Sequence, residues 1–366
     1  SDLTPSKTKV QVTKKWDDAN NQDGIRPATI TVRLYKDGAP TDQTLELSEA
    51  NQWYGTFENL DANAAGKALN YTVKEENVPE GYTLSIDDKD PAHLVLTNKH
   101  EPTVTQVKVT KKWDDANNQD GLRPKEIRVQ LYAGDQKLGK EVVLSSDNKW
   151  THTFEKLAEK ANGQAIHYSV KEVDVPEGYT VTEESKEKSD VVLTNTHTPS
   201  TVDIPVTKIW VDNDNQDGLR PAKITVKLLA NGGEVARKDI TSETDWKETF
   251  TGLPKFKDGK EIVYTLQEEK VENYSPSIDQ ESYTITNTHT PGKTTLSVTK
   301  QWDDQEDKDG LRPKSVKVQL YADGKKSGEV IELSAENKWT HTFADLEKNL
   351  KGKAITYTVE EVDVPT

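Results

Sequence analysis

Hydrophobic and polar residues alternate along this chain with the period of two that is typical of β-strands. In the first hundred residues this alternation places Val10, Val12, Lys14 and Trp16 on one face of a strand. Later short stretches repeat the pattern, separated by turn sequences such as Asp-Gly and Pro-Glu-Gly. The inward positions of these stretches are Ile30, Val32, Leu34; Leu45, Leu47; Trp53, Gly55, Phe57; Tyr71, Val73, Glu75; and Leu94, Leu96, Asn98.

About seven short strands in ~95 residues are typical of an immunoglobulin-like β-sandwich. The Cys…Trp…Cys pattern of true immunoglobulin domains is missing, since the chain has no cysteine. Helical structure is expected only in short turns such as residues 62–67. The sequence therefore predicts an all-β fold.

One unit is repeated four times, and each copy carries the motif Trp-(x)7-Gly-(Ile/Leu)-Arg-Pro. The motif begins at Trp16, Trp113, Trp210 and Trp302, at intervals of 97, 97 and 92 residues. We expect four tandem sandwiches at residues 1–100, 101–198, 199–290 and 291–366, with the fourth ending before its last strands.

Proline-bearing linkers join the copies at residues 99–105, 196–203 and 288–294. Such segments are semi-stiff, so we expect the domains to form an elongated rod.

Composition excludes several classes of function. A net charge of −15 and a pI near 5.1 argue against binding to nucleic acid or to an anionic membrane surface. The absence of cysteine excludes disulfides, thiol catalysis and thiolate metal sites. No apolar run approaches the roughly 18 residues of a membrane span, and the first residues do not form a signal peptide. We expect the mature part of an exported protein rather than a cytosolic one.

Three polar residues in each copy fall on inward-facing positions. A lysine precedes the first tryptophan by two residues, a glutamate ends a Tyr-x-(Val/Leu)-x-Glu strand, and an asparagine ends the last strand. The lysines are Lys14, Lys111, Lys208 and Lys300; the glutamates are Glu75, Glu172, Glu268 and Glu361; the asparagines are Asn98, Asn195 and Asn287.

Taken singly, each of these residues has an ordinary explanation. A strand lysine usually extends its amine to solvent, and a glutamate or asparagine at a strand end is usually solvated. Together they indicate one buried constellation in each copy. It could be an ion pair hydrogen-bonded to an amide, which stabilises little after desolvation, or it could be reactive.

These residues lie in motifs that resemble tandem Cna B-type domains, the repeats of Gram-positive surface adhesins and pilins. The matching stretches are VTKKWDD, DGIRP, WTHTF, YTVKE, VPEGY and LTN(T/K)H, and they cover essentially the whole chain. The third copy departs from the pattern in one loop, where Val271-Glu272-Asn273-Tyr274 replaces VPEGY.

The resemblance implies an intramolecular isopeptide bond between the first-strand lysine and the last-strand asparagine, assisted by the buried acid. Carried over by position, the bonds are Lys14–Asn98 with Glu75, Lys111–Asn195 with Glu172, and Lys208–Asn287 with Glu268. Burial favours a neutral amine, which is the nucleophile, and a neutral acid that can polarise the amide and relay protons until ammonia leaves. The fourth copy has Lys300 and Glu361 but no asparagine to follow, so its lysine is expected to stay free.

Other candidate sites are weak. The loop at residues 17–24 is rich in Asp and Asn but lacks the spacing, the bidentate Glu and the helices of an EF-hand, and we interpret it as an Asx-rich turn. The histidines are scattered, with no metal cluster, and no catalytic triad or phosphate loop is evident. We expect no cofactor and no metal.

The sequence is therefore interpreted as a structural stalk or spacer of a cell-wall-anchored adhesin, and not as an enzyme that turns over. The resemblance implies an extracellular location and covalent attachment to the cell wall through a region outside this chain. A domain outside this chain could bind a host matrix protein. The alternative is a repeated ligand-binding module that recognises a matrix protein through loops such as residues 17–26, with the copies providing avidity.

Overall fold

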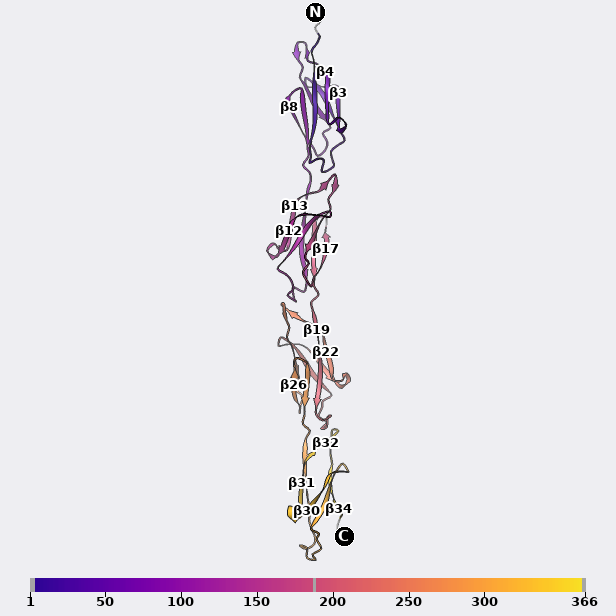
Figure 1. Cartoon of the computed structure of the whole chain (residues 1–366), viewed down its shortest axis with the longest axis vertical. Helices are drawn as coiled ribbons and strands as arrows, with labels where there is room; N and C mark the ends of the chain where they lie inside the picture. Colours follow the sequence, from indigo (N-terminus) through magenta and orange to yellow (C-terminus); the bar gives the residue numbers. More distant parts are fainter. Residues whose placement is uncertain (1–3, 187–188, 364–366) are drawn as a thin grey trace. The chain divides into compact units, whose positions relative to one another are not determined.

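β-Strands account for almost all regular structure in the computed structural model, which describes residues 4–186 and 189–363. The chain divides into a first unit, residues 1–118 and 122–198, and a second unit, residues 119–121 and 199–366. Each unit holds two copies of one strand pattern, which is complete in the first three copies and lacks the last two strands of the larger sheet in the described part of the fourth (Figure 1). Three parts of the predicted domains, at 1–3, 187–188 and 364–366, lie outside the described residues.

Two sheets form the first copy. In the larger sheet β1 lies in the middle, antiparallel to one neighbour and parallel to the last strand of the copy, in the order β4-β1-β9-β8. The smaller sheet has the order β3-β2-β7, and a two-stranded hairpin pairs β5 with β6. The bounds are β1 (Lys7–Asp17), β2 (Thr29–Lys36), β3 (Ala39–Ser48), β4 (Tyr54–Asp61), β5 (Asn63–Ala64), β6 (Lys67–Ala68), β7 (Tyr71–Glu76), β8 (Thr83–Asp90) and β9 (His93–Lys99).

The second copy repeats this topology, in the orders β13-β10-β18-β17 and β12-β11-β16 with the hairpin β14-β15. Its bounds are β10 (Val104–Asp114), β11 (Glu126–Ala133), β12 (Gln136–Ser145), β13 (Thr151–Ala158), β14 (Lys160–Ala161), β15 (Gln164–Ala165), β16 (Tyr168–Val173), β17 (Thr180–Lys186) and β18 (Asp190–Thr196).

The third copy again has the same plan, in the orders β22-β19-β27-β26 and β21-β20-β25 with the hairpin β23-β24. Its bounds are β19 (Thr201–Val211), β20 (Lys223–Ala230), β21 (Gly233–Thr241), β22 (Lys247–Pro254), β23 (Phe256–Lys257), β24 (Lys260–Glu261), β25 (Tyr264–Glu268), β26 (Ser275–Asp279) and β27 (Thr284–Thr288).

In the fourth copy the described residues form the pair β28-β31, the sheet β30-β29-β34 and the hairpin β32-β33. The bounds are β28 (Lys293–Thr299), β29 (Ser315–Ala322), β30 (Lys325–Ser334), β31 (Thr340–Glu347), β32 (Asn349–Leu350), β33 (Lys353–Ala354) and β34 (Tyr357–Val362).

Each copy has a hydrophobic core of its own, enclosed between its two sheets. The first core contains the inward positions predicted by the alternation, for example Val12, Val32 and Leu96, each fully buried. The alternation works because successive side chains of a strand point to opposite faces of its sheet. The predicted all-β fold of tandem immunoglobulin-like sandwiches is confirmed.

The expected helical turn at residues 62–67 is wrong: these residues belong to the hairpin of β5 and β6. Ala65 (φ 50°) and Gly66 (φ 81°) both adopt the left-handed conformation, which a tight two-residue hairpin requires and a right-handed helix excludes. Single 3-10 turns occur instead after the third strand of each copy. They are η1 (Glu49–Asn51), η2 (Ser146–Asn148), η3 (Ser242–Thr244) and η4 (Ala335–Asn337).

Across the described ranges, the structure contains no helix with the length and apolar character needed to cross a bilayer.

Candidate functional site

A lysine, a glutamate and an asparagine meet inside the first sandwich. Lys14 Nζ donates to Oε1 of Glu75 at 2.7 Å, and Asn98 Nδ2 donates to Oε2 of the same carboxyl at 2.8 Å. The lysine comes from β1 and the asparagine from β9, its parallel neighbour; the glutamate comes from β7 in the opposite sheet. Asn98 is 0% exposed, and the side chains of Lys14 and Glu75 are also 0% exposed. One carboxyl group therefore holds the amine and the carboxamide together, away from water.

The second sandwich brings the same three residue types to similar distances. Lys111 Nζ lies 2.8 Å from Oε1 of Glu172, and Asn195 Nδ2 donates to Oε2 of Glu172 at 2.8 Å. The structure therefore brings together the second predicted set as well as the first.

In the third sandwich the same three residue types meet with one difference. Lys208 Nζ, at 2.8 Å, and Asn287 Nδ2, at 3.3 Å, both donate to Oε2 of Glu268. In this copy β25 ends at Glu268 itself, whereas β7 and β16 each continue one residue beyond their glutamate. All three complete sets predicted from sequence are thus assembled.

Burial sets the electrostatics of the three lysines. Desolvation lowers the pKa of Lys14, Lys111 and Lys208 because the charged ammonium loses its hydration. The hydrogen bond and the charge of the partner glutamate act in the opposite direction but do not cancel the effect. A buried amine that loses its proton more readily than usual is a competent nucleophile.

Aromatic rings cover the lysine in the first sandwich. Lys14 Nζ lies 4.8 Å from the ring centroid of Trp16, which meets Trp53 and Tyr82 edge to face at 5.3 and 5.1 Å. Trp53 has a left-handed backbone (φ 57°), and its carbonyl accepts the backbone N–H of Lys14 at 2.7 Å. Left-handed residues other than glycine are uncommon and strained. The matching tryptophans Trp150, Trp246 and Trp339 share this conformation.

The fourth copy holds only part of the site. Lys300 Nζ donates to Glu361 Oε2 at 2.8 Å, but the side chains are 25% and 18% exposed, against 0–3% in the other copies. No asparagine in the described part of this copy faces the pair. The predicted incomplete set is therefore present as an amine and an acid alone.

An ion pair that the sequence interpretation missed organises the loop after β1. Arg26 donates to both carboxylate oxygens of Asp18, at 3.1 and 2.6 Å, and Tyr82 Oη donates to Oδ2 at 2.6 Å. Burial by itself would raise the pKa of Asp18, but hydrogen bonds from Arg26, Tyr82 and the Asn21 backbone outweigh it and lower the pKa to about 2. A sequence signal for this ion pair does exist: in every copy the arginine of the Gly-(Ile/Leu)-Arg-Pro motif follows an aspartate by eight residues.

The divergent loop of the third copy keeps this arrangement. Tyr274 Oη donates to Asp212 Oδ2 at 2.6 Å, and Arg220 binds the same carboxylate. The tyrosine is therefore retained although the Pro-Glu-Gly that precedes it in the other loops is not.

Histidines of the linkers also occupy a defined place. In the first unit His100 contacts the carbonyl of Gly81 through Nδ1 at 2.8 Å and Asp23 Oδ2 through Nε2 at 2.7 Å. The same carboxylate oxygen accepts the backbone N–H of Thr103 at 2.9 Å. In the second unit the corresponding contacts join His289 to Asn273 and Asp217. The sequence showed these histidines only as scattered residues, with no partner assigned.

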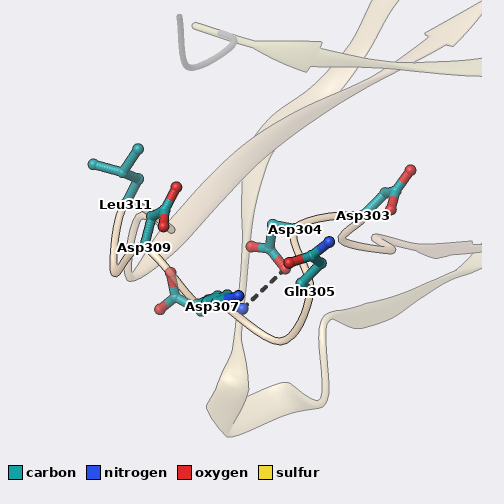
Figure 2. Close-up of a pocket in the computed structure, with 7 residues that line it drawn as sticks. Asp303, Asp304, Gln305, Asp307, Asp309 and Leu311 are labelled. Carbon is teal, nitrogen blue, oxygen red and sulfur yellow. Dashed lines mark hydrogen bonds between the residues drawn. The ribbon is translucent and has the colours of Figure 1, made fainter.

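In the Asp-rich loop of the fourth copy, the Asp304 carboxylate is hydrogen-bonded within the loop itself. Asp304 accepts the backbone N–H of Asp307 at 3.1 Å, and Arg312 binds both of its oxygens. Figure 2 shows the Asp303 and Asp309 side chains at opposite ends of the loop. Within residues 4–186 and 189–363, no group of three or more His, Asp or Glu residues is placed to hold a metal ion.

The chain is 38% identical to the collagen adhesin of Staphylococcus aureus in an alignment 449 positions long. This alignment covers 98% of this chain and 38% of that protein. It therefore spans about two fifths of the length of that relative. A crystal structure of two B repeat units of the S. aureus collagen binding protein is 43% identical, covering 98% of this chain and 94% of the other, with a TM-score of 0.49. A single B repeat unit is 39% identical, covering 53% and 100%, with a TM-score of 0.26.

The model of the Cna protein B-type domain matches residues 10–99, 107–196, 204–288 and 296–366. These stretches contain every Lys, Glu and Asn residue of the sets described above. They account for most of the sequence, and the chain therefore belongs to the Cna B-type domain family, as four tandem copies.

Proposed function

We propose that this chain is a stalk or spacer of a Gram-positive surface adhesin, and that isopeptide bonds strengthen its domains. The bonds would join Lys14 to Asn98, Lys111 to Asn195 and Lys208 to Asn287. The observation that carries the proposal is that, in three copies, one buried glutamate contacts both a lysine amine and an asparagine amide. Kinship with repeats of surface adhesins supports the stalk role.

The chemistry follows from burial. Transfer of the ammonium proton to the glutamate removes two unlike charges from an apolar interior and leaves a neutral amine beside a neutral acid. The amine Nζ then adds to Cγ of the asparagine, and the bond from Cγ to Nδ2 breaks. The glutamate relays a proton from the amine to the departing nitrogen. One secondary amide and one ammonia are formed, and the glutamate ends as the neutral acid, still holding the proton that it took from the ammonium.

The position of each bond explains its use. In the first copy the link would join β1 to β9, the first and last strands, so that tension enters and leaves through neighbouring strands. The loop between residues 14 and 98 would then carry little load. By analogy with disulfide loop closure, such a link stabilises a domain by about 4–5 kcal/mol. The chemistry occurs once per site, so the chain would not act as a turnover enzyme.

The loops give less support to a ligand-binding role. In the loop after β1 the charged groups of Asp18 and Arg26 are already paired with one another. We infer an extracellular location, with attachment to the cell wall and adhesion to a host matrix protein supplied by regions outside these 366 residues.

Intact mass under denaturing conditions tests the central claim. We expect the mass to fall short of the sequence mass by one ammonia for each of three bonds. A peptide map should then contain three branched peptides, one per lysine and asparagine pair. A mass equal to that of the sequence would overturn the isopeptide proposal and leave only an uncrosslinked buried network.

A further inference from the structure

Buried polar atoms without a partner recur at the same place in every copy. Among the described residues these atoms include the indole Nε1 of Trp16, Trp113, Trp210 and Trp302. They also include the carboxamide Oδ1 of Asn98, Asn195 and Asn287. A buried polar group without a hydrogen bond typically costs about 1–3 kcal/mol, and most such groups in folded proteins are paired. A donor and an acceptor left unpaired in each complete copy therefore require an explanation.

The unpaired donor and the unpaired acceptor belong to adjacent residues. In the parallel pairing of β1 with β9, Trp16 is the direct partner of Asn98. Trp113 is paired with Asn195 in the second copy, and Trp210 with Asn287 in the third. Paired residues of neighbouring strands direct their side chains to the same face of the sheet. Each indole therefore lies beside the carboxamide that would react.

The same indole also borders the nucleophile. The lysine Nζ lies 4.8 Å from the ring centroid of Trp16, 4.8 Å from that of Trp113 and 4.4 Å from that of Trp210 in the respective copies. One side chain thus lies against both reactants. A phenylalanine would supply an apolar ring at this position without burying an unpaired N–H.

We propose that the indole N–H of Trp16, Trp113 and Trp210 donates a hydrogen bond to the asparagine oxygen as the isopeptide bond forms. This inference rests on the proposed function. When Nζ adds to Cγ, the electron pair of the C=O double bond moves onto Oδ1, and the N–H stabilises the resulting oxyanion. When the double bond re-forms, Nδ2 leaves with the proton relayed by the glutamate. The indole keeps its proton throughout.

Two physical arguments support this role. A contact that is absent in the ground state and made in the transition state lowers the barrier, whereas one made equally in both does not. Catalytic hydrogen bonds are also often formed only as the reaction proceeds. An indole N–H suits the task because it donates and has no acceptor, so it cannot compete with the glutamate for the proton. The fourth copy keeps the same unpaired N–H at Trp302.

The test replaces one atom of the second copy. Trp113 is exchanged for β-(3-benzothienyl)alanine, in which sulfur replaces the N–H of a ring of nearly the same shape. The full chain is recovered unfolded, refolded and quenched at timed intervals, and the branched Lys111–Asn195 peptide is quantified by mass spectrometry. We expect this bond to form about 10²–10³ times more slowly, the usual loss for one oxyanion donor. The Lys14–Asn98 and Lys208–Asn287 bonds should form at unchanged rates in the same molecules.

A second measurement separates a chemical role from a structural one. The same replacement is made in the Glu172→Gln chain, in which we expect no bond to form. There the unpaired N–H contributes no hydrogen bond, so amide exchange in the second copy should not become faster. Trp113→Phe serves as a second variant without an N–H.

Three results would decide against the inference. Equal rates for the benzothienyl chain and the native chain would show that the N–H is not involved. Faster amide exchange in the Glu172→Gln background would show that the N–H has a structural partner. Absence of the bond from the native chain would overturn the proposed function as well, and intact mass distinguishes that case from the other two.

Discussion

Lys14 Nζ and Glu75 Oε1 lie 2.7 Å apart, although 61 positions separate the two residues in sequence. The lysine belongs to the larger sheet and the glutamate to the smaller one, so the contact exists only when the two sheets pack. Both side chains are fully buried. The amine and the carboxyl group are therefore brought together by the same event that closes the core.

The first prediction concerns the acid. Glu172→Gln should keep a hydrogen-bonding side chain of the same shape but should not relay a proton. The Lys111–Asn195 link should therefore be lost while the second sandwich still folds. A tryptic map should show two branched peptides instead of three. Persistence of the Lys111–Asn195 peptide would mean that another group assists the reaction.

Glu172→Ala removes the whole carboxyl group instead of replacing one of its oxygens. It should also prevent the link, and it should destabilise the second sandwich by about 3–5 kcal/mol because it leaves a buried lysine without its partner. Hydrogen exchange of the full chain, compared copy by copy, measures this loss.

A second prediction concerns the fourth copy, where Lys300 faces Glu361 but no asparagine in the described residues. In the 366-residue polypeptide we expect Lys300 to keep a free amine. An amine-reactive label applied after denaturation should modify Lys300 and spare Lys14, Lys111 and Lys208. A protected Lys300 would show that another residue supplies the acyl group.

The third prediction follows from the two contacts of His100. A carbonyl and a carboxylate can only accept, so contacts to Gly81 and Asp23 require a proton on both ring nitrogens. The hydrogen bond with Asp23 raises the pKa of His100, and the Gly81 carbonyl and the charge of Asp18 raise it further. Tyr82 packs against the ring.

Because the pKa is raised in the folded protein, the stabilisation is fully present below the unfolded value of about 6.5. This stabilisation is lost as the pH rises through the pKa that His100 has in the folded protein. The backbone N–H of Thr103 bonds to the same Asp23 oxygen, so its exchange should accelerate beyond the intrinsic rate as the pH rises through the raised pKa of His100. His289, beside Asp217, should behave in the same way. Nitrogen NMR that finds a neutral ring at pH 6 would contradict this account.

A fourth prediction concerns Asp18, whose pKa is lowered to about 2. A lowered pKa gives stability that is present above the unfolded value of about 3.9 and is lost as the pH falls toward 2. The difference corresponds to about 2–3 kcal/mol. Exchange in the loop at residues 18–26 should increase over that interval.

Tyr82→Phe removes the hydroxyl that donates to Asp18. It should weaken the first sandwich by about 1–3 kcal/mol, because the carboxylate is left with an unfilled acceptor position. The second sandwich, in which Tyr179 makes the same contact with Asp115, serves as the matched control. Equal stability of the two sandwiches in the Tyr82→Phe chain would show that the hydroxyl contributes little.

Local patterns in the sequence determined the fold class and most of the site. The alternation at Val10, Val12 and Lys14 indicated which face of the first strand is buried, since side chains of a strand point to opposite faces in turn. Repetition of the unit then made the inward lysine, glutamate and asparagine recognisable as one set. These inferences need only near neighbours along the chain and a comparison between copies.

The tertiary structure decided what depends on contacts between distant segments. The ion pair of Asp18 with Arg26, and its hydrogen bond from Tyr82 64 positions away, follow from how loops meet at one end of the sandwich. The hairpin at residues 63–68 depends on two left-handed residues, which alternation does not report. The pairing of Trp16 with Asn98 depends on the register of two parallel strands. Register is set by packing of the whole core, because a slip of one residue would turn every buried side chain toward solvent.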